Sequence, residues 1–347
     1  MADVKLTSEV VESSDALEAV NDLVMEKGWG DGLPVIPPTE DRVRRMVDAS
    51  GRGPKDLVGY LDPEGGAATI EKVAINAVMA GCQPDYMPVV VAAVEAIADE
   101  DFLLHGVQTT TNPVAPLLIV NGPIRDKLGI NSGKGTLGPG WRANATIGRA
   151  VRLVMLNIGG ARPVEIDQAS HGMPGKFTMC IGENEEESVW APLHVDRGFA
   201  ADASTVTAVG IQGTTNNLTA FKKTENVLNM IADSMSYWGS NNVLLAGGTP
   251  VVLLTPGHAK MMHDAGWSKE QVRDYLFEHS KIHRSRLPTD ESTNLNLEPT
   301  FIWDGDYLCT ARKAEDLLIV VTGGPEPYHA VFCPSFGDTW AVTKAIG

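Results

Sequence analysis

Cysteine is scarce in this sequence, and its four cysteines, Cys82, Cys180, Cys309 and Cys333, are widely scattered. None of them forms a Cys-x-x-Cys pair. Disulfide frameworks and zinc ribbons both need closely spaced cysteines in sets. The spacing therefore argues against both of these classes, and it predicts free thiols and a cytoplasmic protein.

Basic residues and long apolar runs are also few. The chain has 28 Lys and Arg against 44 Asp and Glu, a formal net charge of −16, which repels phosphate backbones and anionic lipid headgroups. The most apolar stretch, 87–98, contains Glu95 and falls short of the roughly 20 residues that a bilayer requires. We therefore expect neither a nucleic-acid partner nor a membrane partner.

A unit of apolar strand, Pro/Gly turn and helix start recurs along the 347 residues. It appears as LPVIPPTEDRVRRMV (33–47), PLLIVNGPIRDKLG (116–129), PVVLLTPGHAKMMHDAG (250–266) and LLIVVTGGPEP (317–327). Continuous β-branched runs between such turns are typical of strands buried on both faces. The pattern predicts an α/β fold with mixed or mainly parallel sheets and flanking helices. Its recurrence indicates either an internal duplication or the local likeness that any α/β protein shows.

Apolar residues at helical spacing predict helices between these strands. The expected helices are 15–27, 69–80, 88–98, 144–157, 228–238 and 268–279, with Asn144 as an N-cap and a capping box from Ser268 to Gln271. We expect an N-terminal α/β lobe over 1–160 and a C-terminal α/β lobe over 161–347, which carries a polar insert at 165–207.

The segment GKGTLGPGWRANATIGRA (133–150) contains a G-x-G-x-x-G pattern, but neither a strand directly before it nor a helix directly after it. A dinucleotide fingerprint needs both, so the motifs predict no nucleotide cofactor. A helix start beside an arginine favours an anion instead. We therefore expect Trp141, Arg142 and Asn144 to bind a carboxylate or small oxyanion. The alternative is a tight loop in which Arg142 pairs with a protein carboxylate.

The segment 170–199 gathers histidines, a cysteine and acidic residues. Acid–base catalysis near neutral pH needs a histidine, or a carboxylate whose pKa burial has shifted. We expect Glu183 to be a general acid or base, with His171 or His194 as its partner, and Cys180 is the candidate thiol. A solvated acidic turn is the alternative. A metal site from the same carboxylate and both histidines fits no recognised ligand spacing, so no metal is predicted, although one stays open as a minor alternative.

Two further residues follow expected strands directly. Asn121 ends the strand that begins near residue 116, and His258 lies in the turn after the strand that begins near residue 250. Open α/β sheets bind ligands at the carboxyl ends of their strands. We therefore expect both side chains at the rim of a substrate site.

Three stretches resemble a bacterial family of about this length, whose members are named for a UGSC (selenocysteine-Gly-Ser-Cys) motif. They are TIEKVAINAVMAGCQPDYMPVVVAAVEA (69–96), GPGWRANATIGRAVRLVMLNIGGARP (138–163) and FTMCIGENEEESVWAPLHV (177–195). This chain has no Cys-Gly-Ser-Cys run, and FCPSFGD (332–338) is not one. The resemblance implies an enzyme of small-molecule metabolism and carries over no particular reaction.

Three functions remain open. The first is a lyase or hydrolase that uses acid–base chemistry on a small polar or carboxylated metabolite. The second is thiol-dependent catalysis or redox chemistry at Cys180 or Cys82. The third is a metabolite-binding protein without catalysis. In each case the partner is a small molecule, and we expect a homo-oligomer because most soluble assemblies are symmetric.

Overall fold

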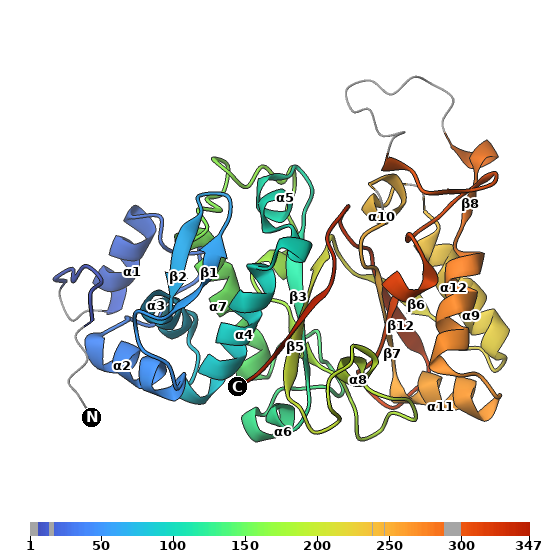
Figure 1. Cartoon of the computed structure of the whole chain (residues 1–347), viewed down its shortest axis with the longest axis horizontal. Helices are drawn as coiled ribbons and strands as arrows, with labels where there is room; N and C mark the ends of the chain where they lie inside the picture. The colour runs from blue at the N-terminus through green and yellow to red at the C-terminus, as the bar shows by residue number, and fades with distance from the viewer. Residues whose placement is uncertain (1–5, 14–16, 238, 246, 288–299) are drawn as a thin grey trace.

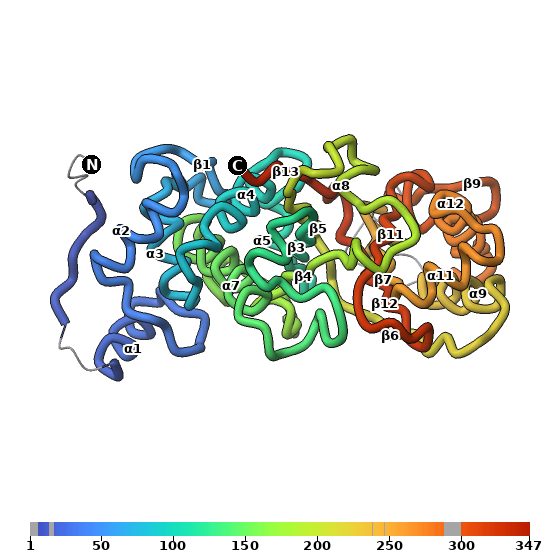
Figure 2. The backbone as a smooth tube through the Cα atoms, turned by 90° about the horizontal axis from the view of Figure 1, so that it is seen from below, coloured from blue at the N-terminus to red at the C-terminus, as the bar shows by residue number. Residues whose placement is uncertain are grey.

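Two mixed β-sheets face each other in the middle of the molecule, and helices cover the outer face of each sheet (Figure 1). This computed structural model describes residues 6–13, 17–237, 239–245, 247–287 and 300–347. The layers follow one another along the long axis of the molecule as helices, sheet, sheet, helices (Figure 2). The expected α/β class is confirmed.

The first sheet has the strand order β13-β5-β3-β4. Its strands are β3 (Ala115–Asn121), β4 (Cys180–Gly182), β5 (Thr205–Ile211) and β13 (Val342–Ala345). β3 and β4 are parallel, whereas β5 is antiparallel to both β3 and β13. Helices α3 (Ile70–Ala80), α4 (Met87–Ile97) and α7 (Arg142–Asn157) cover its outer face.

The second sheet has the order β11-β7-β12-β6. Its strands are β6 (Thr215–Leu218), β7 (Val251–Leu254), β11 (Leu318–Val321) and β12 (His329–Cys333). β7 and β11 are parallel, and β12 is antiparallel to both β6 and β7. Helices α9 (Thr224–Met235), α11 (Pro256–Asp264) and α12 (Lys269–His279) cover its outer face.

The remaining elements lie around this frame. They are α1 (Leu17–Glu26), α2 (Glu40–Ala49), α5 (Leu104–Thr109), α6 (Ile124–Leu128), α8 (Leu193–Asp196), α10 (Asn241–Leu244), β1 (Leu57–Leu61), β2 (Gly66–Thr69), β8 (Ile282–His283), β9 (Trp303–Asp304) and β10 (Tyr307–Leu308). In the part of the chain that the structure describes, no helix combines the length and apolar character needed to cross a membrane.

The two halves share one topology and exchange their last strands. β3 leads through α6 and α7 to β4 and β5, and β7 leads through α11 and α12 to β11 and β12. The next strand then joins the opposite sheet, since β6 pairs with β12 and β13 pairs with β5. The two connections cross at a bridge between Ile211 and Ser335. This arrangement is the one that an internal duplication produces.

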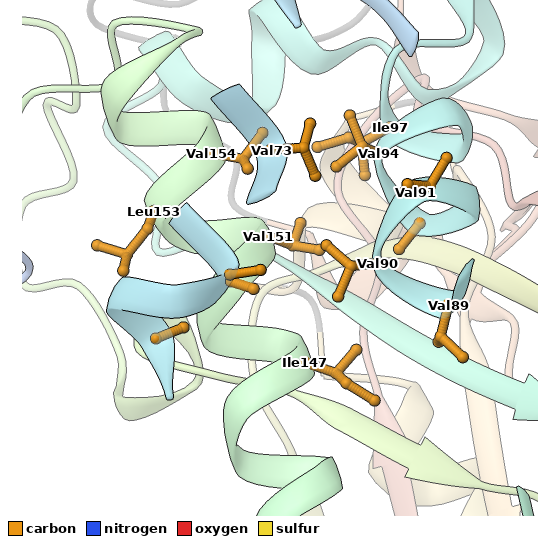
Figure 3. Close-up of a cluster of buried hydrophobic side chains, with 14 of the residues drawn as sticks. Val73, Val89, Val90, Val91, Val94, Ile97, Ile147, Val151, Leu153 and Val154 are labelled. Atoms are coloured by element: carbon orange, nitrogen blue, oxygen red, sulfur yellow. The ribbon is translucent and has the colours of Figure 1, made fainter. Parts of the chain in front are cut away.

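Alternation along the apolar runs explains the layering. Leu117 and Ile119 of β3 pack between the sheets, whereas Leu118 packs under the helices. The strand is therefore apolar on both faces, as strands covered on both sides are. Under the helices the core is rich in valine (Figure 3). Val90 of α4 and Val151 of α7 are buried there.

Four sequence expectations need correction. The segment 33–39 forms no strand and leads into α2, since Pro37 and Pro38 have no N–H to donate to a ladder. A boundary at 160 does not separate two sheets, because the first sheet takes strands from both sides of it. The segment 165–207 is not an insert, since it supplies β4, an edge strand of the first sheet, and the start of β5. Finally, α7 begins at Arg142, so Asn144 lies inside the helix and is not its cap.

The capping box of α12 is confirmed, with Ser268 and Gln271 bonding each other's backbone N–H groups. The other expected helices begin or end within a few residues of α1, α3, α4 and α9. Residues 15, 16 and 238 of the expected helices lie outside the described residues.

Candidate functional site

The carboxyl ends of the parallel strands from both sheets lie along one long side of the molecule. α6 and α11, which follow β3 and β7, lie on this same side, the lower one in Figure 1. The edge strands β4 and β11 touch here: Asn184 N–H donates to Val321 O over 2.7 Å, and the Thr322 hydroxyl donates to Gly182 O over 2.8 Å. Carboxyl ends of parallel strands are where open α/β sheets bind ligands.

Glu183 occupies the junction between the sheets. It directly follows β4 and is completely buried. Its Oε2 accepts hydrogen bonds from Asn121 Nδ2 at 2.6 Å and from the backbone N–H of Leu193 at 2.7 Å. Burial raises the pKa of Glu183, and the charge of Lys269 and these hydrogen bonds only partly oppose the rise. The side chain therefore holds a proton at higher pH than an exposed glutamate does.

Glu185 lies beside it and shares the same amide. Asn121 Nδ2 also donates to Glu185 Oε1 at 2.9 Å, and the backbone N–H of Gly122 donates to that oxygen at 2.8 Å. The Nε atom of Arg125, whose side chain is 2% exposed, lies 3.3 Å from it. Arg125 also binds Glu186, with Nη2 2.7 Å from Oε1. One carboxylate oxygen thus lies at the centre of a set of buried donors.

His194 faces the same oxygen. Its Nδ1 lies 3.9 Å from Glu185 Oε1, and its Nε2 lies 3.3 Å from the carbonyl of Ala201. Since a carbonyl only accepts, Nε2 carries the proton of the neutral ring and Nδ1 is the free acceptor. The imidazole is completely buried.

Three buried polar atoms around Glu185 have no hydrogen-bond partner within the described residues. They are Asn121 Oδ1, His194 Nδ1 and Arg125 Nε, of which the last lies 3.3 Å from Glu185 Oε1 as an ion pair without forming a hydrogen bond. Buried polar atoms are nearly always paired, so unpaired ones in one place indicate a water or ligand that completes them. We call Asn121, Arg125, Glu183, Glu185 and His194 the Glu185 cluster.

The segment 184–198, which includes α8, covers the cluster and is held at two points. Arg125 binds Glu185 and Glu186 near its start. Near its end, the buried Lys269 of α12 binds Asp196 at 2.6 Å and the carbonyl of Ala191 at 2.9 Å. The Glu185 side chain is 16% exposed, whereas Glu183 and His194 are fully buried. Glu185 is therefore the point at which the cluster reaches the surface.

His171 is not part of this cluster. Its neighbour Ser170 donates to the carbonyl of Thr111, just before the amino end of β3. Glu183 donates its backbone N–H to Val120, at the carboxyl end of the same strand. At about 3.3 Å per residue, the length of β3 separates them by roughly 20 Å. His171 is exposed there and does not partner Glu183.

At the start of α7, where an anion site is expected, Arg142 and Asn144 bond to backbone groups of the protein itself. Arg142 donates to the carbonyl of Gly81 at 2.9 and 3.0 Å. Asn144 is buried, and its side chain bonds the backbone of Asn131 and Cys180. The indole of Trp141 covers the loop glycine at 135 and is 37% exposed. Asn144 therefore ties the loop to β4, and Arg142 ties the start of α7 to the end of α3. Among the described residues, no hydrogen bond joins any of the three to Glu183.

The thiols are poorly placed for nucleophilic chemistry. All four cysteines are buried. Burial raises the pKa of Cys180, and it raises that of Cys82 to about 12 despite a hydrogen bond to Thr146 O. A thiolate is the reactive form, so these surroundings disfavour the thiol hypothesis.

His258 serves the second sheet. It is completely buried, its Nδ1 lies 2.8 Å from the Thr255 hydroxyl, and its Nε2 lies 2.7 Å from the Thr219 hydroxyl. Burial, with a smaller contribution from His329, lowers its pKa to about 4. His258 closes a capping box at the start of α11 and stays neutral.

Sequence reasoning missed two members of this region. Arg125 is the second residue of α6, and Lys269 is the first residue of α12. In sequence, each looks like an ordinary charged surface residue. The one available signal for Arg125 is its place four residues after Asn121, near the carboxyl end of a predicted strand. No three His, Cys, Asp or Glu side chains among the described residues are placed to hold a metal ion.

In comparisons with known proteins, the sequence matches no family model and no curated protein. The resemblance to the UGSC-motif family therefore stays a prediction of the sequence.

Proposed function

We propose that this protein is an enzyme that transfers protons on a small polar molecule at the Glu185 cluster. The observation that supports it most is the set of three buried polar atoms around one carboxylate oxygen that make no hydrogen bond within the described residues. A substrate hydroxyl could donate to Asn121 Oδ1 or His194 Nδ1 and accept from Arg125 Nε, whereas a substrate ammonium group could donate to both acceptors. Such groups would complete the set that the protein alone leaves open.

The two carboxylates have different roles in this proposal. Burial raises the pKa of Glu183, so Glu183 is the proton donor. Glu185 and His194 Nδ1 present two acceptors 3.9 Å apart, so they take up the proton. An acid and a base on one substrate are what an elimination or a hydrolysis requires, and a lyase or hydrolase is the class that we propose.

The charge around the cluster favours a neutral or amine-bearing substrate over a carboxylated one. If Glu183 carries the proton, as this proposal requires, Glu185 and Glu186 share the cation Arg125. Lys269 is paired with Asp196. The remaining negative charge attracts an amine and repels a carboxylate.

The test combines ligand identification with matched variants. Small neutral, amine-bearing and carboxylated metabolites are screened for thermal stabilisation, and those that bind are assayed for turnover. In Glu183→Gln and His194→Gln we expect kcat to fall by about 10²-fold or more, which is the usual weight of a general acid or base. Glu187→Gln, which changes an exposed neighbour, should leave kcat unchanged.

Turnover within twofold of wild type in both variants would overturn the proposal. Tight binding of a screened compound at this cluster without any turnover would favour the alternative of a metabolite-binding protein. A cytoplasmic location and a homo-oligomeric state are further proposals that rest on the sequence alone.

A further inference from the structure

A small cavity lies far from the Glu185 cluster, between α7 and the amino-terminal half of β3. Its volume is about 10 Å³. The segment 175–179, which leads into β4, closes one side. The apolar part of its lining includes Val114, Leu118, Val151, Met155 and Met179.

Two cations, Arg152 of α7 and Lys176, border this cavity and share one carboxylate. Lys176 Nζ binds both oxygens of Asp167, at 2.6 and 2.7 Å. Arg152 reaches that carboxylate only with Nη2, at 3.5 Å, and its Nη2 lies equally far from the carbonyl of Ala161. The Asp167 carboxylate therefore pairs mainly with Lys176, and it compensates the positive charge of Arg152 only weakly.

Within the described residues, no other carboxylate forms an ion pair with Arg152. Asp31 acts on Arg152 only at longer range, and its two oxygens are taken by Arg149 at 2.7 and 2.8 Å. Among the described residues, no hydrogen bond is found for Nε or Nη1 of Arg152. The Arg152 side chain is nevertheless only 13% exposed, and that of Lys176 only 14%.

The balance of charge beside the cavity is thus positive in largely apolar surroundings. Burial lowers the pKa of both Arg152 and Lys176, and the attraction of Asp167 only partly offsets it. A buried charge without a full partner is costly, so an anion in the cavity would be stabilised by two nearby cations.

We infer that this cavity binds a monatomic anion such as chloride, held between Arg152 and Lys176. A volume near 10 Å³ accommodates about one water-sized particle. Carboxylates and phosphates are larger than this space. The anion would fasten α7 to the segment that leads into β4, whatever reaction the distant cluster performs.

Thermal unfolding in sodium chloride or bromide, against sodium gluconate at equal ionic strength, tests this site. A ligand that binds only the folded state raises Tm with its concentration. We expect a halide-specific rise that saturates, with an apparent halide affinity at least tenfold weaker in Lys176→Gln. Lys260→Gln, which removes a lysine from an exposed pair with Asp264, should keep the wild-type response.

Crystals of the wild-type protein soaked in bromide give a second measurement that needs no variant. An anomalous peak between the Arg152 guanidinium and the Lys176 ammonium is expected. An equal halide response in wild type and Lys176→Gln would overturn the inference. So would the absence of a bromide peak, which also decides the matter if Lys176→Gln fails to fold.

Discussion

Nδ1 of His194 and Oε1 of Glu185 face each other across 3.9 Å as two hydrogen-bond acceptors. With Nε2 directed at the carbonyl of Ala201, the neutral imidazole has no proton to offer to the carboxylate. Two buried acceptors in this position leave room for one donor, which is either a proton taken up from solution or a donor group of a bound molecule. This pair is the basis of the proposed function.

The raised pKa of Glu183 gives folding a defined pH dependence. A carboxyl group whose pKa is raised on folding stabilises the protein below about pH 4.5 and loses that contribution as the pH rises through the raised pKa. Glu183→Gln removes this loss. We expect the free energy of unfolding of the variant to gain on wild type with pH above 4.5, by at most about 1.4 kcal/mol per pH unit.

Urea unfolding of wild type and Glu183→Gln at a series of pH values measures that difference. Glu187→Gln is the control, because it removes a charge from an exposed position in the same segment. Parallel curves for wild type and Glu183→Gln would mean that Glu183 is ionised in the folded protein at the same pH as in the unfolded chain.

Native cysteines should resist alkylation. With a pKa of about 12, the thiols of Cys82 and Cys333 are ionised to about one part in ten thousand at pH 8, and burial limits access as well. We expect iodoacetamide to modify them only after unfolding in guanidinium, as read by mass spectrometry. Rapid stoichiometric alkylation of Cys180 in the folded protein would instead restore the thiol hypothesis.

The sequence predicts the parts of this fold that are encoded locally. The apolar run at 117–120 is a strand covered on both faces, and Ser268 with Gln271 starts α12. The exchange of β6 and β13 between the sheets is not local, since no pattern within a strand says which sheet it joins. For the same reason, a boundary near residue 160 could not be judged from composition.

The sequence could select Asn121, Glu183 and His194 as site residues. Asn121 ends a predicted strand, and Glu183 and His194 lie in the segment 170–199, which is rich in acidic residues and histidines. Arg125 and Lys269 could not be selected, because burial of a charged side chain depends on partners distant in sequence. Closeness in sequence predicts His171 as a partner of Glu183, yet the two residues lie near opposite ends of β3.

The depressed pKa of His258 predicts acid sensitivity. Because its pKa falls from 6.5 to about 4 on folding, its contribution is complete above pH 6.5 and is lost as the pH falls toward 4. That difference corresponds to about 3 kcal/mol. His258→Gln should flatten the dependence of unfolding free energy on pH between 4 and 6.5, whereas His263→Gln, exposed on the same helix, should not. An unchanged slope in His258→Gln would show that other groups cause the acid sensitivity.

Glu71 should anchor the segment 6–13 to the body of the protein. This buried carboxylate at the start of α3 accepts the backbone N–H groups of Ser8 at 2.7 Å and Thr7 at 3.0 Å. Burial opposes its ionisation, but the hydrogen bonds from Ser8 and Thr7 together lower its pKa. Hydrogen bonds to a charged group contribute about 1.5–3 kcal/mol, enough to hold a terminal segment in place.

In Glu71→Ala we therefore expect the amide protons of Thr7 and Ser8 to exchange about tenfold faster or more, since each 1.4 kcal/mol of lost local stability corresponds to a factor of ten. Hydrogen exchange followed by mass spectrometry measures this directly. Glu95→Gln, which breaks the partly exposed pair with Arg52, should leave these two amides as in wild type. Equal protection of Thr7 and Ser8 in wild type and Glu71→Ala would show that other contacts of the segment hold it, and that the carboxylate only satisfies donors already fixed in place.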